Sequence, residues 1–485
     1  MPLSTVTQAT GAALREASGY LADLVTPAVR LGVTGLARSG KTVFIAALVR
    51  NLTLGGRLPF FSVASEGRLI RAYLEPQPDD AIPRFAYEDH LAALAHDPPA
   101  WPESTRRISQ LRVTIEYASA SRVRRALTPG RLHLDIVDYP GEWLVDLPMM
   151  AQSYAEWSAE ALALASAPRR TTPATTAWLA FARGLDATAA QDEQVAITGA
   201  KLFTDYLVAA RAADPTLSIT GPGRFLLPGE LEGSPLLTFF PLPDAHGTMR
   251  SALAQMMERR FESYKTHVIR PFFRDHFSRL DRQIVLVDAL SALNSGTAGI
   301  ADLESALTSV LAAFRPGRAS WLGQLFAPRI DRIAFAATKA DHLHSANHDR
   351  LEAILGTLTA RAEARASGAG AEVRAFALAA LRATREGEVT RDGQRLACIV
   401  GTPLAGETIG GKVFDGKTSA AVFPGDLPKL DQMPGQPAFT FKNDIHVVRF
   451  SPPRIVTETP SGLVAPWPHV RLDRALEFLI GDHLV

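Results

Sequence analysis

The chain has 485 residues, of which 47% are apolar and 21% are charged, so it is long enough for two or three domains of ordinary globular composition. Its formal net charge of +1 provides no positive field to attract nucleic acid, and we expect no nucleic-acid partner. Its one cysteine, Cys398, excludes an internal disulfide and fits a reducing cytoplasm. No apolar run approaches the roughly 20 residues that a membrane-spanning helix needs, so no transmembrane segment is predicted.

A glycine-rich loop lies between an apolar strand and a helix in residues 31–52. Its sequence GLARSGKT, at 35–42, matches the pattern G-x-x-x-x-G-K-[ST] in full. Gly35 and Gly40 let the backbone curl so that successive N–H groups point at phosphate oxygens. Lys41 is expected to reach the β- and γ-phosphates, and the Thr42 hydroxyl is expected to ligate Mg²⁺. Further nucleotide contacts are predicted at Ala37, Arg38, Ser39 and Val43.

A second motif follows at the end of a strand. Residues 55–102 contain many prolines and predict a loop-rich insertion, after which the alternating residues 111–117 predict a half-buried strand. The next strand, 132–137, ends in Asp138, and Gly141 three residues later completes the pattern D-x-x-G. In this context Asp138 is expected to hold Mg²⁺ through a water, and the Gly141 amide is expected to sense a γ-phosphate.

The next part of the chain changes character. Helical patterns dominate residues 146–280, at 149–165, 175–182, 193–213 and 252–280. Because this segment is too long to be a loop, it predicts a helical insertion. Alternation then resumes, with strands at 283–287, 333–337 and 373–378 and helices at 300–314 and 351–366. Beyond residue 385 the sequence is rich in glycine and proline, with short β-like runs at 397–400, 413–414 and 446–450 and a closing helix at 472–480.

A third motif indicates the base of the nucleotide. The strand 333–337 is followed by Thr-Lys-Ala-Asp, which has the pattern T-K-x-D. The Asp341 carboxylate can accept hydrogen bonds from both the N1–H and the 2-amino group of guanine, a donor pair that adenine lacks. The stem of Lys339 would lie over the purine, and Thr338 would tie this loop to the phosphate loop. The motif stands at the C-terminal end of a later strand of the sheet, where the base of the nucleotide is expected. It therefore favours GTP and GDP over adenine nucleotides.

These patterns together predict an α/β fold. We expect a phosphate-loop GTPase-like core with a mostly parallel sheet, a large all-helical insertion and a β-rich C-terminal extension closed by a helix. The predicted divisions are 1–145 and 281–384 for the core, 146–280 for the insertion and 385–485 for the extension.

Several segments resemble the YcjX-like family of stress-associated, phosphate-loop GTPase-like proteins. They are GLARSGKT (35–42), DPPAWP (97–102), VDYPGEWL (137–144), DRQIVLVD (281–288), AATKADH (336–342) and ALEFLIGD (475–482), and they extend over nearly the whole chain. The resemblance implies GTP and GDP binding with Mg²⁺, a role in stress response and a membrane-protein partner. It also implies a last guanine contact at 378–380, around Ala379, where Leu-Ala-Ala departs from the usual Ser-Ala pattern. We expect a cytoplasmic protein, with the periphery of the inner membrane as the alternative.

The residue after Gly141 bears on hydrolysis, because GTPases commonly position the attacking water with a glutamine there. Here Glu142 holds that place. Its carboxylate can orient a water, but it repels the γ-phosphate unless Mg²⁺ or an arginine shields it, and the alternative is that it faces solvent. Arg38 is a candidate internal arginine finger, and Thr105 is a candidate switch threonine and Mg²⁺ ligand. We therefore predict slow intrinsic hydrolysis and a conformational switch.

Two other classes of function stay open at this point. A phosphate-loop ATPase or small-molecule kinase should lack T-K-x-D and needs acceptor-binding residues that we do not find in the sequence. A nucleotide-binding adaptor would bind without hydrolysis and would still keep Lys41, Thr42 and Asp138. The sequence names neither the protein partner nor the process that the switch controls.

Overall fold

The computed structural model describes residues 26–35, 38–103, 107–120, 130–186, 190–214, 216–217, 221–243, 251–312, 330–367, 370–391, 393–429, 445–455 and 465–485. All structural statements below concern these residues. Among them we find no helix that combines the length and the apolar character needed to cross a membrane.

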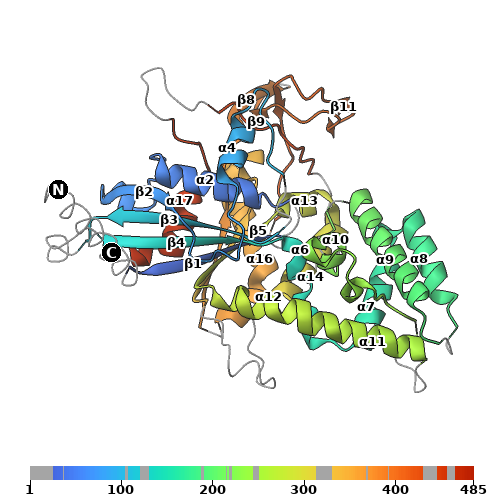
Figure 1. The fold of residues 1–485 in the computed structure, drawn as a ribbon. Helices are drawn as coiled ribbons and strands as arrows, with labels where there is room; N and C mark the ends of the chain where they lie inside the picture. Colours follow the sequence, from blue (N-terminus) through green and yellow to red (C-terminus); the bar gives the residue numbers. More distant parts are fainter. Residues whose placement is uncertain are drawn as a thin grey trace, which may run out of the picture.

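The centre of the molecule is a sheet with the strand order β2-β3-β4-β1-β5-β6-β7 (Figure 1). The strands are β1 (Ala28–Gly35), β2 (Leu69–Glu75), β3 (Ser109–Tyr117), β4 (Gly130–Asp138), β5 (Arg282–Val287), β6 (Arg332–Ala337) and β7 (Glu372–Ala377). Strands β4, β1, β5, β6 and β7 are parallel, whereas β3 is antiparallel to both of its neighbours. The predicted mostly parallel sheet is therefore confirmed.

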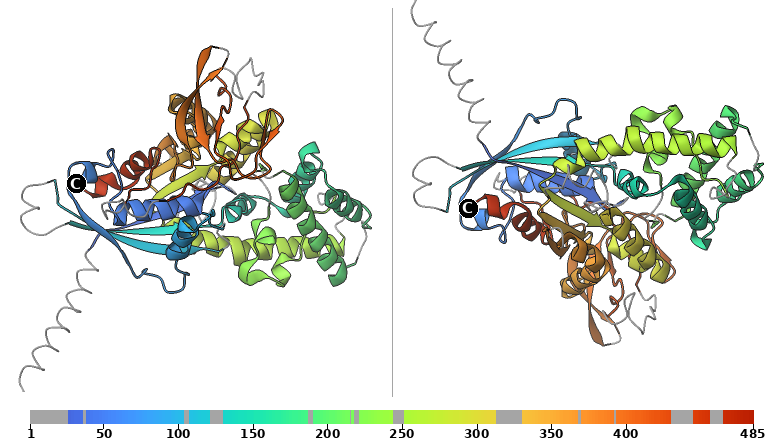
Figure 2. Two further views of the ribbon diagram at one scale, coloured as in Figure 1. Left: turned by 90° about the horizontal axis from the view of Figure 1, so that it is seen from above. Right: turned by 90° about the horizontal axis from the view of Figure 1, so that it is seen from below.

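Helices pack on both faces of this sheet (Figure 2). They are α2 (Lys41–Thr53) and α17 (Leu472–Ile480) on one face and α14 (Gly296–Ala312) and α16 (His348–Ser367) on the other, with α13 (Ala289–Asn294) between β5 and α14. Adjacent residues of a strand point to opposite faces, so Ile284 packs in the cluster of α2 and α17 and Val285 packs in that of α14 and α16. This double cover explains why β5 and β6 are apolar and buried along nearly their whole length.

The proline-rich segment 55–102 contains more regular structure than its sequence predicts. α3 (Ser62–Ser65) precedes the edge strand β2, and α4 (Tyr87–Ala95) follows it. β2 pairs with β3 at the border of the sheet, so most of its side chains are half-buried or exposed and its sequence lacks a clean alternation. Pairing with β3, more than the local pattern, makes this segment a strand.

Between β4 and β5 the described chain is helical, as predicted, and this part lies to one side of the sheet (Figure 1). Its elements are α6 (Gly141–Leu144), η1 (Leu147–Ala151), α7 (Tyr154–Ala165), η2 (Pro168–Arg170), α8 (Pro173–Arg183), α9 (Glu193–Ala213), α10 (Gly223–Leu226), η3 (Gly229–Leu231), η4 (Pro235–Leu237), α11 (Ala252–Tyr264), the π-helical η5 (Lys265–Ile269), α12 (Arg270–Asp275) and η6 (Phe277–Arg279). Polar residues cap several helices: Asp192, for example, accepts hydrogen bonds from the first backbone N–H groups of α9. Aromatic side chains fill the interior, where Trp178 of α8 stacks on Tyr206 of α9 with ring centroids 5.1 Å apart.

The C-terminal part forms a small antiparallel sheet above the core. Its strands β8 (Arg385–Arg391), β9 (Gln394–Gly401) and β12 (Ala420–Val422) lie in the order β12-β9-β8, and β10 (Thr408–Ile409) pairs with β11 (Lys412–Val413). The strand predicted at 446–450 is wrong, because there Phe450 makes an isolated bridge to Pro403 and the preceding residues are irregular. Pro452 and Pro453, which carry no N–H groups, follow after Ser451 and cannot extend a ladder. Three short 3₁₀ helices remain among the described residues. η7 (Ala340–His342) and η8 (Ser345–Asn347) lie between β6 and α16, and η10 (Gly481–His483) follows α17.

Candidate functional site

The loop between β1 and α2 has the backbone geometry of an anion cradle. Arg38 and Gly40, on either side of Ser39, have positive φ values of 62° and 82°. This alternation of backbone conformation turns successive N–H groups inward. A Cβ at Gly40 would meet nothing within 4 Å, so the space over the loop is open. A Cβ at Gly35 would lie 2.3 Å from Ser39 Oγ and 2.6 Å from the Leu286 carbonyl oxygen, so this position admits glycine alone. The Lys41 ammonium donates to the Gly35 carbonyl at 3.3 Å and stays within the loop.

The residues predicted to hold a metal lie next to this loop. Thr42 is the second residue of α2, and its hydroxyl donates to the Glu103 carbonyl at 3.3 Å. Asp138 ends β4 beside Val33 of β1, is buried, and is followed by α6, which begins at Gly141. A hydroxyl and a carboxylate are hard oxygen donors of the kind that Mg²⁺ prefers. Thr105 and Ala37 lie outside the described residues.

The T-K-x-D residues follow β6 at the same edge of the sheet. The Thr338 hydroxyl donates to the Val287 carbonyl at 3.3 Å, so it ties this loop to β5 and not, as predicted, to the phosphate loop. Lys339, with a φ of 60°, forms an ion pair with Asp288 at the end of β5. Asp341 is 3% exposed, and its Oδ2 accepts the backbone N–H of Ala383 at 2.7 Å. The carboxylate is therefore fixed in one orientation.

Ala379, the predicted last guanine contact, pairs with Val470. Its N–H donates to the Val470 carbonyl at 3.1 Å, and its carbonyl accepts the Val470 N–H at 2.8 Å. This bridge to the segment before α17 already uses the Ala379 N–H, although Ala379 itself lines the cavity described next, so a guanine contact there stays a prediction. Ala380 and Leu381, which follow it, also line the cavity described next.

One cavity of about 300 Å³ joins the phosphate loop to the T-K-x-D loop. It is lined by Arg38, Ser39, Gly40, Lys41, Thr42, Val43, Phe44, Trp101, Pro102, Thr338, Lys339, Asp341, His342, Leu378, Ala379, Ala380, Leu381, Ala383, Leu404, Arg449 and Phe450. Asp138, Gly141 and Glu142 are not in this lining and stand beside the loop. The site therefore brings together most of the predicted nucleotide contacts.

The far wall of the cavity comes from residues that the sequence reasoning missed. Trp101 donates its indole N–H to the Phe450 carbonyl at 2.8 Å, and the ring of His342 meets that of Phe450 edge-on at 5.0 Å. Burial lowers the pKa of His342, so its ring is neutral at pH 7. The resemblance of DPPAWP to a family segment could have indicated a role for Trp101 in the site. The irregular segment around Phe450 contains no motif that indicates such a role.

Positive charge from three parts of the chain surrounds the phosphate loop. Glu142, whose side chain is 10% exposed, forms an ion pair with Arg211 of α9 and does not face solvent. Burial opposes ionisation of Glu142, but the charges of Lys41 and Arg211 outweigh it and lower its pKa. Burial also lowers the pKa of Arg38, and the charges of Arg449 and Arg211 lower it further. Arg211 and Arg449 are distant in sequence from every motif, which is why the motifs did not reveal them.

The segment after Gly141 is held by the helical part of the chain. The Trp143 ring lies between the Arg224 guanidinium, 3.3 Å from its centroid, and the Phe272 ring at 5.9 Å. Asp146 accepts hydrogen bonds from the Gly223 N–H and the Tyr264 hydroxyl, both at 2.6 Å. Burial raises the pKa of Asp146 to about 6. This segment is therefore in direct contact with α10, α11 and α12.

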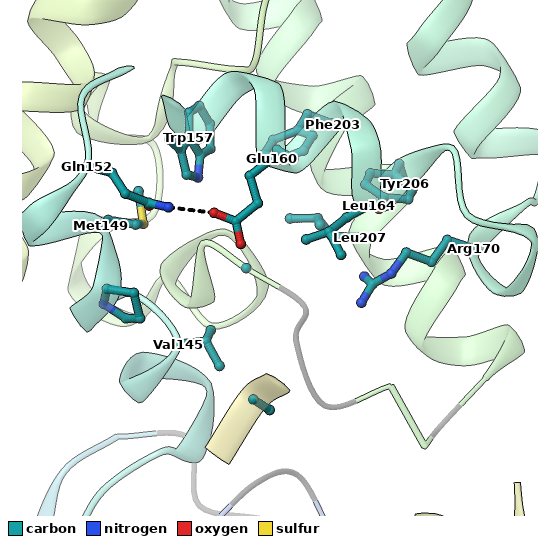
Figure 3. Close-up of a pocket in the computed structure, with 14 residues that line it drawn as sticks. Val145, Met149, Gln152, Trp157, Glu160, Leu164, Arg170, Phe203, Tyr206 and Leu207 are labelled. Carbon is teal, nitrogen blue, oxygen red and sulfur yellow. Dashed lines mark hydrogen bonds between the residues drawn. The ribbon is translucent and has the colours of Figure 1, made fainter. Parts of the chain in front are cut away.

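A smaller cavity, of about 70 Å³, lies at the same junction (Figure 3). Val145 and Met149, which follow α6, face Phe203 and Leu207 of α9 across it. Gln152 donates to Glu160 at 2.5 Å on its rim. Its mostly apolar lining indicates an incompletely packed contact between the two segments.

The sheet order, the phosphate loop and the T-K-x-D loop define the fold of a Ras-like, phosphate-loop GTPase. A sequence model described as "YcjX-like family, DUF463" matches residues 29–484, and the chain belongs to this family. The chain is 40% identical over 468 residues to a protein of Escherichia coli named "Ras-like GTPase YcjX", covering 94% of this chain and 96% of the relative. It is 35% identical over 481 residues to a protein of the same name from Shewanella oneidensis, covering 94% of each.

Proposed function

We propose that this protein binds GTP and GDP with Mg²⁺ and hydrolyses GTP slowly, so that the bound nucleotide sets its conformation. One observation carries the proposal: the phosphate loop and Asp341 line a single cavity at the carboxyl ends of parallel strands. The name of the two relatives, Ras-like GTPase, supports the same class of activity.

The phosphate end of the cavity uses backbone and cation together. The N–H groups between Arg38 and Gly40 and the N-terminus of α2 would face the phosphate oxygens, with Lys41 inside the loop. Thr42 and Asp138, with Thr105 as a further predicted ligand, would hold Mg²⁺, which neutralises phosphate charge when it is bound.

The base end of the cavity selects guanine. Asp341, fixed by Ala383, would accept hydrogen bonds from the N1–H and the 2-amino group. With adenine the buried carboxylate would have no such donor pair, and a buried acceptor without a partner costs free energy. The stem of Lys339 and the wall of Trp101 and Phe450 would enclose the base and ribose.

The switch follows from the contacts of α6. The Gly141 amide would approach a γ-phosphate and withdraw after hydrolysis. Glu142, Trp143 and Asp146 contact the helices of the predicted insertion, 146–280, so these helices would move with the nucleotide state. We further propose that the moving helices meet a protein partner; a role in stress response and a partner at a membrane are expectations from the family resemblance.

Calorimetric titration with GDP, a non-hydrolysable GTP analogue and ADP, each with Mg²⁺, tests the nucleotide assignment. Wild type should prefer guanine nucleotides by about 10⁴-fold, as expected for a site that hydrogen-bonds its ligand through a buried polar group. Asp341→Ala should lose this preference, and Lys41→Ala should lose affinity for every nucleotide. Lys201→Ala, at an exposed position on α9, is the matched control and should bind as wild type does.

The same experiment separates the alternatives. Equal or preferential binding of ADP would contradict the base assignment and would favour an ATPase or kinase. Guanine binding without release of phosphate from GTP over hours would favour the nucleotide-binding adaptor.

A further inference from the structure

Glu142 follows Gly141, and its negative charge would repel a γ-phosphate bound beside it. In GTPases a neutral glutamine at this place commonly orients the attacking water. Glu142 is ionised at neutral pH, because its pKa is lowered, and a carboxylate beside a γ-phosphate repels it. This inference rests on the proposed hydrolysis of GTP, and hydrolysis with Glu142 at this position needs a cation that contacts the carboxylate.

Arg211 is that cation, and the helical part of the chain supplies it. Its guanidinium Nη2 contacts Oε1 of Glu142, 69 residues away in sequence. Ala210, the residue before Arg211, and Leu207, one turn before it, are buried in the aromatic interior of the helical part. Their packing fixes the α9 backbone at Arg211. The side chains of Arg211 and Glu142 are 28% and 10% exposed, so the pair is largely shielded from solvent. Ion pairs with this degree of burial are stronger than surface pairs.

The backbone of Glu142 is held by the same part of the molecule. A Cβ at Gly223 of α10 would lie 1.9 Å from the Glu142 carbonyl oxygen, so α10 packs directly on α6. The Gly223 N–H also bonds to Asp146 at 2.6 Å. Both the main chain and the carboxylate of Glu142 are therefore oriented by helices outside the sheet.

The charges that face Glu142 are Lys41 from the phosphate loop and Arg211 from α9. Arg224, from α10, lies over the Trp143 ring instead. Arg211 is also near enough to Arg38 for the two charges to repel each other. The Glu142–Arg211 pair thus stands at the phosphate loop, beside the lysine expected to contact the γ-phosphate.

We propose that Arg211 is a positioning residue for hydrolysis: α9 delivers its guanidinium to Glu142, which neutralises the carboxylate and lets it orient the attacking water. The water oxygen forms a bond to the γ-phosphorus as the bond from that phosphorus to the β,γ-bridging oxygen breaks. GDP leaves with the electron pair, and the proton released by the water passes to the phosphate product, while Glu142 accepts a hydrogen bond from the water and orients it. Arg211 touches Glu142 and not the reacting atoms.

Single-turnover GTP hydrolysis in a double-mutant cycle tests this role. Arg211→Ala should slow hydrolysis by about 100-fold, the loss expected when a reacting group is misplaced, while the affinity for GDP stays unchanged. Glu142→Gln introduces the neutral residue that needs no shield and should retain hydrolysis. Because Arg211 acts through the carboxylate, the double variant Glu142→Gln/Arg211→Ala should recover most of the rate lost in Arg211→Ala. A merely structural role of Arg211 would show no such rescue.

Two further arms complete the test. Arg211→Ala should raise the pKa of Glu142 and move the acid limb of the pH–rate profile to higher pH, and Arg211→Lys should restore part of the rate. Lys201→Ala, on the same helix, should match wild type. Equal losses from Arg211→Ala in both backgrounds would overturn the proposal, since Arg211 would then act on the phosphate or on the fold. An Arg211→Ala protein that hydrolyses GTP at the wild-type rate would also overturn it. A wild-type protein that shows no preference for guanine nucleotides would instead overturn the proposed function itself.

Discussion

Gly35 and Gly40 show how two glycines of one motif serve different physical needs. At Gly35 the obstacle is steric, because a Cβ would meet Ser39 Oγ and the Leu286 carbonyl at less than the closest distances that Cβ atoms tolerate. At Gly40 the space is open and the obstacle is conformational, since its φ of 82° is one that other residues rarely adopt. The sequence pattern requires both glycines without distinguishing these reasons.

We therefore expect Gly35→Ala to be the more harmful of the two substitutions. It should lower the free energy of unfolding by about 1–3 kcal/mol, because the phosphate loop must move away from β5. Gly40→Ala should cost about 1 kcal/mol, the strain of a left-handed residue. Urea denaturation monitored by tryptophan fluorescence measures both values. Equal losses would contradict the steric account of Gly35.

At the scale of elements, the sequence predicts best where one local pattern decides the structure. The bounds of α9 and α17 are those predicted, because an N-cap such as Asp192 and an amphipathic run mark them. The edge strand β2 was missed and a strand at 446–450 was predicted in error, because in both cases pairing with distant residues decides the outcome. The motif residues of the site were predictable for the same local reason, whereas Arg211 and Phe450 reach it through tertiary packing.

Asp146 connects α6 to α10 and α11, and its titration should be visible in stability. Its pKa of about 6 lies above the ordinary value of 3.8, so the folded state binds the proton more tightly than the unfolded chain does. The stabilisation from this proton is complete below about pH 4 and is lost as the pH rises through about 6, up to about 3 kcal/mol in total. Asp146→Asn keeps an acceptor for the Gly223 N–H but does not titrate.

The unfolding free energy of Asp146→Asn relative to wild type should therefore increase between pH 4.5 and pH 7.5. Urea denaturation of both proteins at the two pH values measures this change, and a difference that is the same at both would contradict the raised pKa. Lys201→Ala, at an exposed position of α9 away from Asp146, is the control and should follow wild type at both pH values.

At the scale of the whole molecule, three distant parts of the chain meet around one site. The sheet supplies the phosphate loop and Asp341, α9 supplies Arg211, and the C-terminal part supplies Arg449 and Phe450. Irregular residues beside the small β-sheet, Leu404, Arg449 and Phe450, therefore form part of the wall of this cavity, so the C-terminal part is not a separate appendage. The bond from Trp101 to Phe450 links the end of the proline-rich segment 55–102 to the C-terminal part.

This link should slow the release of nucleotide. The indole N–H of Trp101 donates to the Phe450 carbonyl at 2.8 Å within the wall of the cavity, and this bond holds together the two segments that we expect to enclose the nucleotide. Trp101→Phe keeps an aromatic ring in the wall but removes the hydrogen bond, whose net worth is about 1 kcal/mol. Dissociation of a fluorescent GDP analogue, followed by stopped flow, should become about fivefold faster, because changes in such contacts act mainly on the dissociation rate. Phe423→Ala, at an exposed position in the same C-terminal part, should leave the rate unchanged. An unchanged rate in Trp101→Phe would show that the C-terminal wall does not retain the nucleotide.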